Sequence, residues 1–282
     1  MSANMKIVAD SSSDVLRLEA VPYAAAPLKI MTEKREYVDN DALDVEKMVE
    51  DFRQSSEKSH TACPNVDDWL SAFGDAQYVF CVTITSGLSG SYNAACIAAQ
   101  EYEDKNPDRK VFVIDSLSAG PELKLIIEKL EELIKEGKSF EEICDAIKEY
   151  QKHTGLLFML ESLKNLANNG RVSKIVASAA GILGIRVLGK ASDKGELEQL
   201  VKSRGENRAL PTLTELLGKL GYAGGKVRIS HCCNENAANK LKALILEKFS
   251  KAQVEIYKAR GLCSFYAEKG GLLVGFEKCP AR

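Results

Sequence analysis

Short apolar runs alternate with helical periodicity along the first half of the chain. Runs rich in β-branched residues predict buried strands over Met5–Ala9, Tyr78–Ile84 and Lys110–Ile114. Apolar residues three and four positions apart predict helices over Glu122–Lys135 and Ser139–Lys152, and the second of these opens on a Ser-x-x-Glu capping box. Strands that alternate with helices in this way predict an α/β fold with a doubly wound parallel sheet.

The same half contains one short connection with candidate chemistry. Pro64 restricts Cys63 to extended geometry, and Asn65 with Asp68 resembles a helix start. Thr61 is accordingly expected in a loop between two helices. The remaining elements expected in this half are strands over Tyr23–Met31 and Glu36–Val38 and helices over Asp44–Gln54, Asn65–Phe73 and Ser91–Gln100.

The pattern changes near Thr154, after which hairpin-like turns occur among the helices. This mixture predicts a second domain of α+β type, so we divide the chain into residues 1–157 and 158–282. The elements expected in the second domain are strands over Leu156–Leu160, Ile185–Lys190, Leu197–Ser203, Lys226–Ser230, Gln253–Tyr257 and Leu272–Phe276, and helices over Glu161–Ala167, Lys174–Leu183, Pro211–Leu220 and Asn234–Phe249.

The stretch Tyr78–Ala95 carries the clearest indication of a binding site. A predicted strand is followed by the hydroxyl- and glycine-rich loop Thr85–Gly90, and a predicted helix begins at Ser91. The free backbone N–H groups and the dipole at such a helix start favour an anion. No Lys or Arg lies between Tyr78 and Gln100. The loop therefore suits a singly charged carboxylate better than a triphosphate.

Two other predicted strands end in Asp and Ser, over Asp10–Asp14 and Asp115–Ser118. The first of these loops has two interpretations, which stay open at this point. It forms a turn with a helix cap, because Ser and Asp are the usual capping residues. Alternatively it lines the same crevice as Thr85–Gly90, because the ends of parallel strands share one edge of a sheet.

Composition narrows the classes of function. The chain has 282 residues, 45% of them hydrophobic, and a formal net charge of -2, so nothing indicates binding to nucleic acid or to an anionic membrane. No apolar run reaches the length of a membrane span, and the N-terminus lacks a signal-peptide core, so a cytoplasmic protein is expected. Eight Cys without a CxxC pair and three His make a zinc site improbable. The vicinal pair Cys232-Cys233 fits one inward thiol with an incidental neighbour better than a redox site.

The loop also approaches the pattern of a serine hydrolase. Gly87–Ser91 nearly matches the nucleophile elbow G-x-S-x-G, with Ser89 as the nucleophile, but Ser91 stands where the last glycine belongs. A catalytic triad would need His231 and an acid such as Asp115. Because the elbow packs tightly, serine in place of glycine speaks against this alternative.

Two arginines remain to be interpreted. Arg171 follows the turn Asn168-Asn169-Gly170, where a solvated cation is usual. Arg204 lies at a strand end near Lys202 and Arg208. That cluster is either a solvated face or a docking patch for an acidic partner.

Taken together, these segments resemble the DegV family of fatty-acid-binding proteins, which serve as the acyl-carrying subunit of bacterial fatty-acid kinase. The most specific segment is ITSGLSGSYNAA, which is similar to the family's Ser-Ser-x-Leu-Ser-Gly-Thr-Tyr element. The other segments follow in the family's order along the whole chain. They are KIVADSSSDV, HTACPN, VIDSLSAG, LKNLANNGRVSK and VKSRGENRAL.

The resemblance implies two α/β domains with a long-chain fatty acid buried between them. It assigns the carboxylate to Thr61 and Ser89, with Ser86 and the Gly90 amide as neighbours, and it places Arg171 near the head group. It implies a carrier rather than an enzyme, with no cofactor besides the bound fatty acid. A regulatory protein with a structural lipid is the remaining alternative.

The resemblance also implies a kinase subunit as partner, engaged through Arg204. Two departures from the family's pattern stand out. Ala62-Cys63 replaces Ser-Gln beside the expected carboxylate contact. The family's His-x-Gly-Pro-Gly element falls near Ala267–Gly271, where the His and the Pro are missing. Because that His is associated with phosphotransfer, its absence puts the coupling to a kinase in question.

Overall fold

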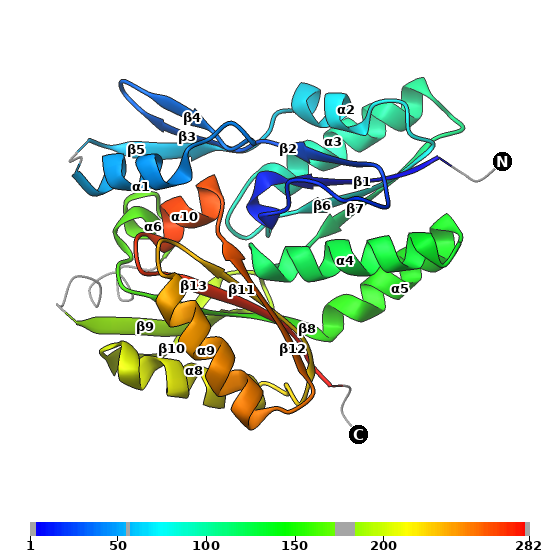
Figure 1. The fold of residues 1–282 in the computed structure, drawn as a ribbon. Helices are drawn as coiled ribbons and strands as arrows, with labels where there is room; N and C mark the ends of the chain where they lie inside the picture. The colour runs from blue at the N-terminus through cyan, green and yellow to red at the C-terminus, as the bar shows by residue number, and fades with distance from the viewer. Residues whose placement is uncertain (1–3, 55–56, 173–183, 280–282) are drawn as a thin grey trace.

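A computed structural model describes residues 4–54, 57–172 and 184–279 (Figure 1). The helix expected over Lys174–Leu183 lies outside these residues. Within these described residues, the strands form three sheets: a four-stranded sheet in the N-terminal half, a six-stranded sheet in the C-terminal half, and a small three-stranded sheet beside the first.

The N-terminal sheet has the order β2-β1-β6-β7, and all its neighbours are parallel. Its strands are β1 (Met5–Asp10), β2 (Tyr23–Ala26), β6 (Tyr78–Thr83) and β7 (Lys110–Asp115). Helices cover both faces, as α2 (Val66–Phe73), α3 (Ser91–Lys105), α4 (Pro121–Lys135) and α5 (Phe140–Lys152). Along β6, Val79 and Cys81 pack with α2 and α3, while Phe80 and Val82 pack with α4 and α5. The predicted doubly wound parallel sheet is confirmed.

The small antiparallel sheet has the order β4-β3-β5 and corrects two predictions. Its strands are β3 (Lys29–Thr32), β4 (Glu36–Val38) and β5 (Ser59–Ala62), and helix α1 (Val45–Gln54) follows β4. The single strand expected over Tyr23–Met31 is divided at Pro27, which has no amide hydrogen for a ladder, so β2 and β3 join different sheets. Thr61 lies in β5 and not in a loop, because it pairs with Ile30.

The C-terminal sheet has the order β10-β9-β8-β13-β11-β12, antiparallel except for the parallel pair β11–β12. The mixed α+β architecture expected for this half is confirmed. Its strands are β8 (Thr154–Leu160), β9 (Ile185–Ala191), β10 (Leu197–Arg204), β11 (Gly225–His231), β12 (Ala252–Lys258) and β13 (Leu272–Glu277). One face packs on α8 (Glu206–Lys219) and α9 (Glu235–Lys248).

The short helices differ most from expectation. Helix α6 is confined to Lys164–Asn168, and α8 begins at Glu206 with Pro211 inside it rather than at its start. Helix α10 (Gly261–Ala267) was not predicted. It is too short for a clear periodic pattern, and its N-terminal amides are bound by Asp39 from the other half of the chain.

Helix α4 lies between the two large sheets and packs against strands of both. Its start approaches β13 so closely that a Cβ on Gly275 would lie 2.5 Å from a backbone atom of Pro121. The predicted boundary between residues 157 and 158 falls inside β8, which belongs wholly to the C-terminal sheet. We propose that the division between the two halves lies before Thr154.

Candidate functional site

The loop after β6 is held at both ends by one buried carboxylate. Asp10 Oδ2 accepts hydrogen bonds from the Ile84 amide at 2.8 Å and from the Ser91 hydroxyl at 2.7 Å. Asp10 Oδ1 accepts a hydrogen bond from the amide of Ser12, so Asp10 is the N-cap of a short 3₁₀ turn over Ser11–Ser13. Burial raises the pKa of Asp10, and the surrounding donors oppose this shift. The Asp10–Asp14 loop is therefore a capped turn that braces the binding loop.

A second carboxylate holds the middle of the loop. Asp115 Oδ1 accepts from the amides of Ser86 and Leu117, each at 3.1 Å. The Thr85 amide donates to the Ser118 carbonyl at 2.9 Å. The ends of β1, β6 and β7 thus form one rigid edge, as expected for neighbouring parallel strands.

This edge opens on an apolar cavity of about 280 Å³ between the N-terminal sheet, β5, α10 and the inner face of the C-terminal sheet. Strand β8 shows how the sequence builds it. Leu157 and Met159 point into the core beneath α8 and α9, while Leu156, Phe158 and Leu160 line the cavity. Both faces of β8 are therefore apolar. The cavity residues are Leu28, Thr61, Ala62, Cys63, Ile84, Leu88, Ser89, Gly90, Ala119, Leu156, Phe158, Leu160, Leu166, Arg171, Leu197, Leu262, Cys263, Tyr266, Ala267 and Leu273.

Polar groups are few in this lining. Four of the residues indicated by the sequence contribute to it: Thr61 from β5, Ser89 and Gly90 from the loop before α3, and Arg171 after α6. Ser89 Oγ accepts from the Ser91 amide at 3.2 Å, which leaves its own hydrogen available to a ligand. Gly90 is the N-cap of α3 and makes no side-chain cap.

Arg171 is tied to the same loop. Its Nε donates to the Leu88 carbonyl at 3.2 Å, and its Nη1 donates to the Asn169 carbonyl. It is therefore not the solvated turn cation that its sequence context alone would favour. A small set of donors beside an apolar cavity suits a ligand with an acceptor head and an apolar tail.

Tyr266 is a polar residue of this cavity that sequence reasoning missed. It comes from α10, and its hydroxyl lies 2.8 Å from Thr61 Oγ1. Its neighbour Ala267, which stands at the departure from the family's His-containing element, also lines the cavity. The departure from the family's pattern could have indicated Tyr266, because this hydroxyl-bearing residue directly precedes Ala267.

Two predicted residues lie elsewhere. Ser86 is exposed and is not in the cavity lining, and its amide serves to anchor the loop on Asp115. Arg204 is exposed at the end of β10, away from the cavity lining. A role for Ser86 in ligand contact and a role for Arg204 in partner binding stay predictions.

The catalytic triad of a serine hydrolase is not assembled. His231 lines a different cavity, beside Asp14 and Tyr257, and its Nδ1 accepts from the Asn234 amide at 3.3 Å. Asp115 is engaged by backbone amides, and none of the three histidines lines the cavity that contains Ser89. Among the described residues, no histidine is therefore placed to activate Ser89 as a nucleophile.

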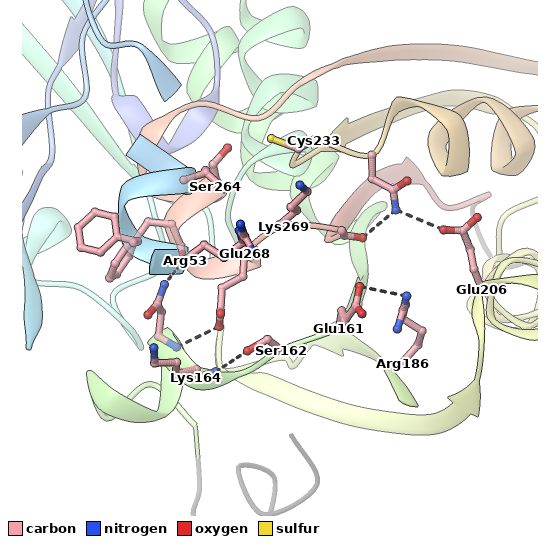
Figure 2. Close-up of a pocket in the computed structure, with 16 residues that line it drawn as sticks. Arg53, Glu161, Ser162, Lys164, Arg186, Glu206, Cys233, Ser264, Glu268 and Lys269 are labelled. Atoms are coloured by element: carbon pink, nitrogen blue, oxygen red, sulfur yellow. Dashed lines mark hydrogen bonds and ion pairs between the residues drawn. The ribbon is translucent and has the colours of Figure 1, made fainter. Parts of the chain in front are cut away.

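A larger cavity of about 590 Å³ lies on the other side of α10 and is polar (Figure 2). Figure 2 shows Arg186 facing Glu161, and their ion pair measures 3.0 Å. Glu206 pairs with Lys240, and Glu268 accepts from the Asn165 amide at 3.0 Å. Some of its charges are thus paired with neighbouring protein groups, whereas Arg186 Nε and Nη1 are buried without a hydrogen-bond partner among the described residues. This charged lining does not suit an acyl chain.

The cysteines and the described helices give no indication of a redox, metal or membrane site. Cys232 is buried, with its thiol 3.6 Å from the Ser264 carbonyl, whereas Cys233 is exposed. This agrees with the interpretation of the pair as one inward thiol with an incidental neighbour. Within the described residues, no group of His, Cys, Asp and Glu is arranged to bind a metal. No described helix combines the length and apolar character needed to cross a membrane.

Comparison with known proteins identifies the family. The sequence pattern described as "Uncharacterised protein, DegV family" matches residues 4–278. This chain belongs to the DegV family. A DegV domain-containing protein of Streptococcus pneumoniae is 45% identical over 276 residues, which cover 96% of this chain and 98% of the relative. A DegV domain-containing protein of Streptococcus gordonii is 42% identical over the same length, with the same coverage of both chains.

Solved DegV structures share the fold over nearly the whole chain. A DegV family protein from Eubacterium eligens, solved loaded with heptadecanoic acid, has a TM-score of 0.96 and 47% identity, covering 98% of this chain and 100% of its own. The fatty acid kinase (Fak) B3 protein of Streptococcus pneumoniae, solved loaded with linoleic acid, has a TM-score of 0.95 and 44% identity, covering 98% and 99%. The two-part architecture implied by the resemblance is therefore confirmed.

Proposed function

We propose that this DegV protein binds a long-chain fatty acid in the apolar cavity and acts as a carrier rather than as an enzyme. The observation that supports this most directly is the combination of an apolar lining with a few donors at Thr61, Ser89 and Gly90. The two similar DegV structures loaded with heptadecanoic and linoleic acid give independent support.

In this proposal the acyl chain supplies the affinity and the polar groups supply the orientation. Burying about 15 methylenes contributes on the order of 12 kcal/mol before costs, at ~0.8 kcal/mol per methylene. Association and ordering reduce that figure considerably. The carboxylate would accept hydrogen bonds from Thr61, Ser89 and the Gly90 amide, with Arg171 as the nearby positive charge. Ser86 is exposed and lies outside the cavity lining, so we expect it to make no direct contact with the carboxylate.

The test is organic extraction of the purified protein followed by mass spectrometry. We expect release of a fatty acid of about 14–18 carbons, the lengths that the family resemblance implies and whose methylenes would supply the affinity. After removal of lipid, titration with hexadecanoic acid should show saturable binding. An extract without lipid, together with no binding by the delipidated protein, would contradict the proposal.

We further propose that the bound acid is presented to a kinase subunit in the cytoplasm, with Arg204 at the contact surface. The support is the likeness to the Fak B3 protein and the exposed position of Arg204. Unpaired cysteines fit a reducing compartment. Arg204→Glu should abolish capture of a fatty-acid kinase subunit, whereas Lys135→Glu at the end of α4 should leave it unchanged. A protein that retains lipid but never captures the kinase subunit would instead favour a regulatory protein with a structural lipid.

A further inference from the structure

The turn of the β9–β10 hairpin, Ser192–Glu196, packs against the loop after β6. An added Cβ on Gly195 would overlap Thr85 Oγ1 and lie 2.9 Å from Thr85 Cβ. From the other side, an added Cβ on Gly87 would lie 2.8 Å from the Lys194 carbonyl oxygen. The two segments come from opposite halves of the chain and meet without room for a side chain on either glycine.

Hydrogen bonds within the turn fix its shape. The Gly195 amide donates to the Ser192 carbonyl, and the Ser192 amide donates to the Glu196 carbonyl, each at 2.8 Å. Ser192 Oγ accepts from the amides of Lys194 and Glu196 at 3.3 and 3.1 Å. Gly195 is buried and has a φ of +72°, a conformation that residues with a side chain rarely adopt. The turn therefore presents a fixed surface to the loop.

Thr85 links this contact to the apolar cavity. Its side chain is buried, and its Oγ1 accepts from the Gly87 amide at 3.1 Å, so rotating the hydroxyl away from the turn would break that bond. Ser89 and Gly90 follow in the same loop and line the cavity, as does Leu197 at the start of β10. A displacement of Thr85 by the turn would therefore shift the segment that carries the polar groups.

We propose that the turn Ser192–Glu196 holds the loop in the conformation that presents Ser89 and the Gly90 amide to a carboxylate, with Gly195 as a positioning residue. Gly195 is outside the cavity lining, so it acts through the loop and not by touching the ligand. This inference rests on the proposed fatty-acid-binding function and deepens it. It makes binding of the head group depend on a contact between the two halves of the chain.

The test is titration of delipidated Gly195→Ala protein with hexadecanoic acid. The added methyl group has to push the turn and Thr85 apart. The acid should therefore bind about 5- to 50-fold more weakly, the range for one or two weakened hydrogen bonds.

Gly137→Ala, just after α4, is the matched control. Gly137 has a φ of +74°, so alanine meets the same backbone strain there, but its added Cβ would have no neighbour within 4 Å. Affinity for the acid should change by less than about 2-fold, because the position lies away from the cavity lining. Urea unfolding should show that both variants lose stability, whereas only Gly195→Ala also loses affinity. Equal affinity of the two variants for the acid would overturn the inference.

Two further variants probe the same contact and cover the case in which Gly195→Ala fails to fold. Gly87→Ala places its Cβ 2.8 Å from the Lys194 carbonyl oxygen without a positive φ, and it should also weaken acid binding. Unchanged affinity in Gly87→Ala would contradict the inference.

Thr85→Ala removes the hydroxyl that the methyl group would overlap. Gly195→Ala should therefore lose less affinity in the Thr85→Ala background than in the unchanged protein. Losses that add fully would also overturn the inference. Absence of acid binding by the unchanged protein would overturn the proposed function instead, so the two failures are distinguishable.

Discussion

At the scale of single residues, the buried carboxylate of Asp10 determines where Ser89 lies. It accepts from the Ile84 amide and the Ser91 hydroxyl, which flank the loop, and from the amide of Ser12. A buried carboxylate is costly unless such donors surround it. Asp10 does not line the cavity, so its role is to brace the binding loop and not to contact a ligand.

Ser89 itself gives the clearest residue-scale prediction. Ser89→Ala should weaken binding of hexadecanoic acid by roughly 1–3 kcal/mol, because the carboxylate would lose a hydrogen-bond partner in a cavity with few others. Isothermal titration of delipidated protein measures the change. Ser86→Ala is the matched control in the same loop. Because Ser86 is absent from the cavity lining, this variant should bind hexadecanoic acid with unchanged affinity. The reverse pattern would place the carboxylate at Ser86.

At the scale of elements, β13 and α4 depend on one glycine. Gly275 packs against the start of α4, where an added Cβ would lie 2.5 to 2.7 Å from backbone atoms of Pro121 and Glu122. Backbone atoms cannot move aside as the end of a flexible side chain can. The strand and the helix therefore have to separate if this position carries a side chain.

Gly275→Ala should destabilise the protein by about 1–3 kcal/mol, as overpacking of a close contact does. Denaturant unfolding measures this directly. Gly218→Ala in α8 serves as the control, because its Cβ would make an ordinary contact of 3.4 Å with Phe249 and alanine favours the helix by about 1 kcal/mol. A Gly275→Ala protein as stable as the Gly218→Ala variant would contradict the close packing of α4 on β13.

At the scale of the whole molecule, buried acids join the two halves near α10. Asp14 Oδ1 accepts from the Arg260 amide at 2.8 Å, and Asp39 accepts from the amides of Gly261 and Leu262. Burial raises the pKa of Asp14 to about 7, and the nearby charge of Asp39 adds to the rise while Arg260 opposes it. Asp14 Oδ2 is buried without a hydrogen-bond partner among the described residues.

A raised carboxyl pKa means that the folded state binds the proton more tightly than the unfolded chain. The resulting loss of stability is absent below the usual value of 3.8, grows as the pH rises, and is complete above about 7. We expect Asp14 to lower the free energy of unfolding by roughly 3 kcal/mol between pH 5 and 8, since one pKa unit is about 1.4 kcal/mol. Asp14→Asn should remove this part of the pH dependence of the free energy of unfolding, which urea unfolding measures at each pH.

The difference in pH dependence between the unchanged protein and the Asp14→Asn variant isolates the contribution of Asp14 from that of other titrating groups. Burial lowers the pKa of His231, which acts in the opposite direction because the unfolded state then binds more protons. Asp10 and Asp39 have raised pKa values and act in the same direction as Asp14. All three remain in the variant. Equal slopes for the two proteins would show that Asp14 does not titrate in this range.

Features that depend on neighbours along the chain could be predicted from the amino-acid pattern alone. Hydrophobic periodicity located most strands and helices, and the capping boxes at Asn65–Asp68 and Ser139–Glu142 are both present. The strand-loop-helix arrangement indicated the loop over Thr85–Gly90, whose Ser89 and Gly90 line the apolar cavity. These signals are local, because capping and amphipathicity involve residues within one or two turns.

Contacts between residues that are distant in the sequence depend on how the two halves pack. Thr61 lies in a strand because it pairs with Ile30, and α10 forms where Asp39 binds its first amides. Tyr266 reaches Thr61 across 205 positions of sequence. An apolar pattern predicts that one face of an element is buried, and a capping pattern predicts that an amide is hydrogen-bonded. Neither pattern identifies the partner. The packing of the two halves determines these partners, and it also determines which polar groups line one end of the cavity.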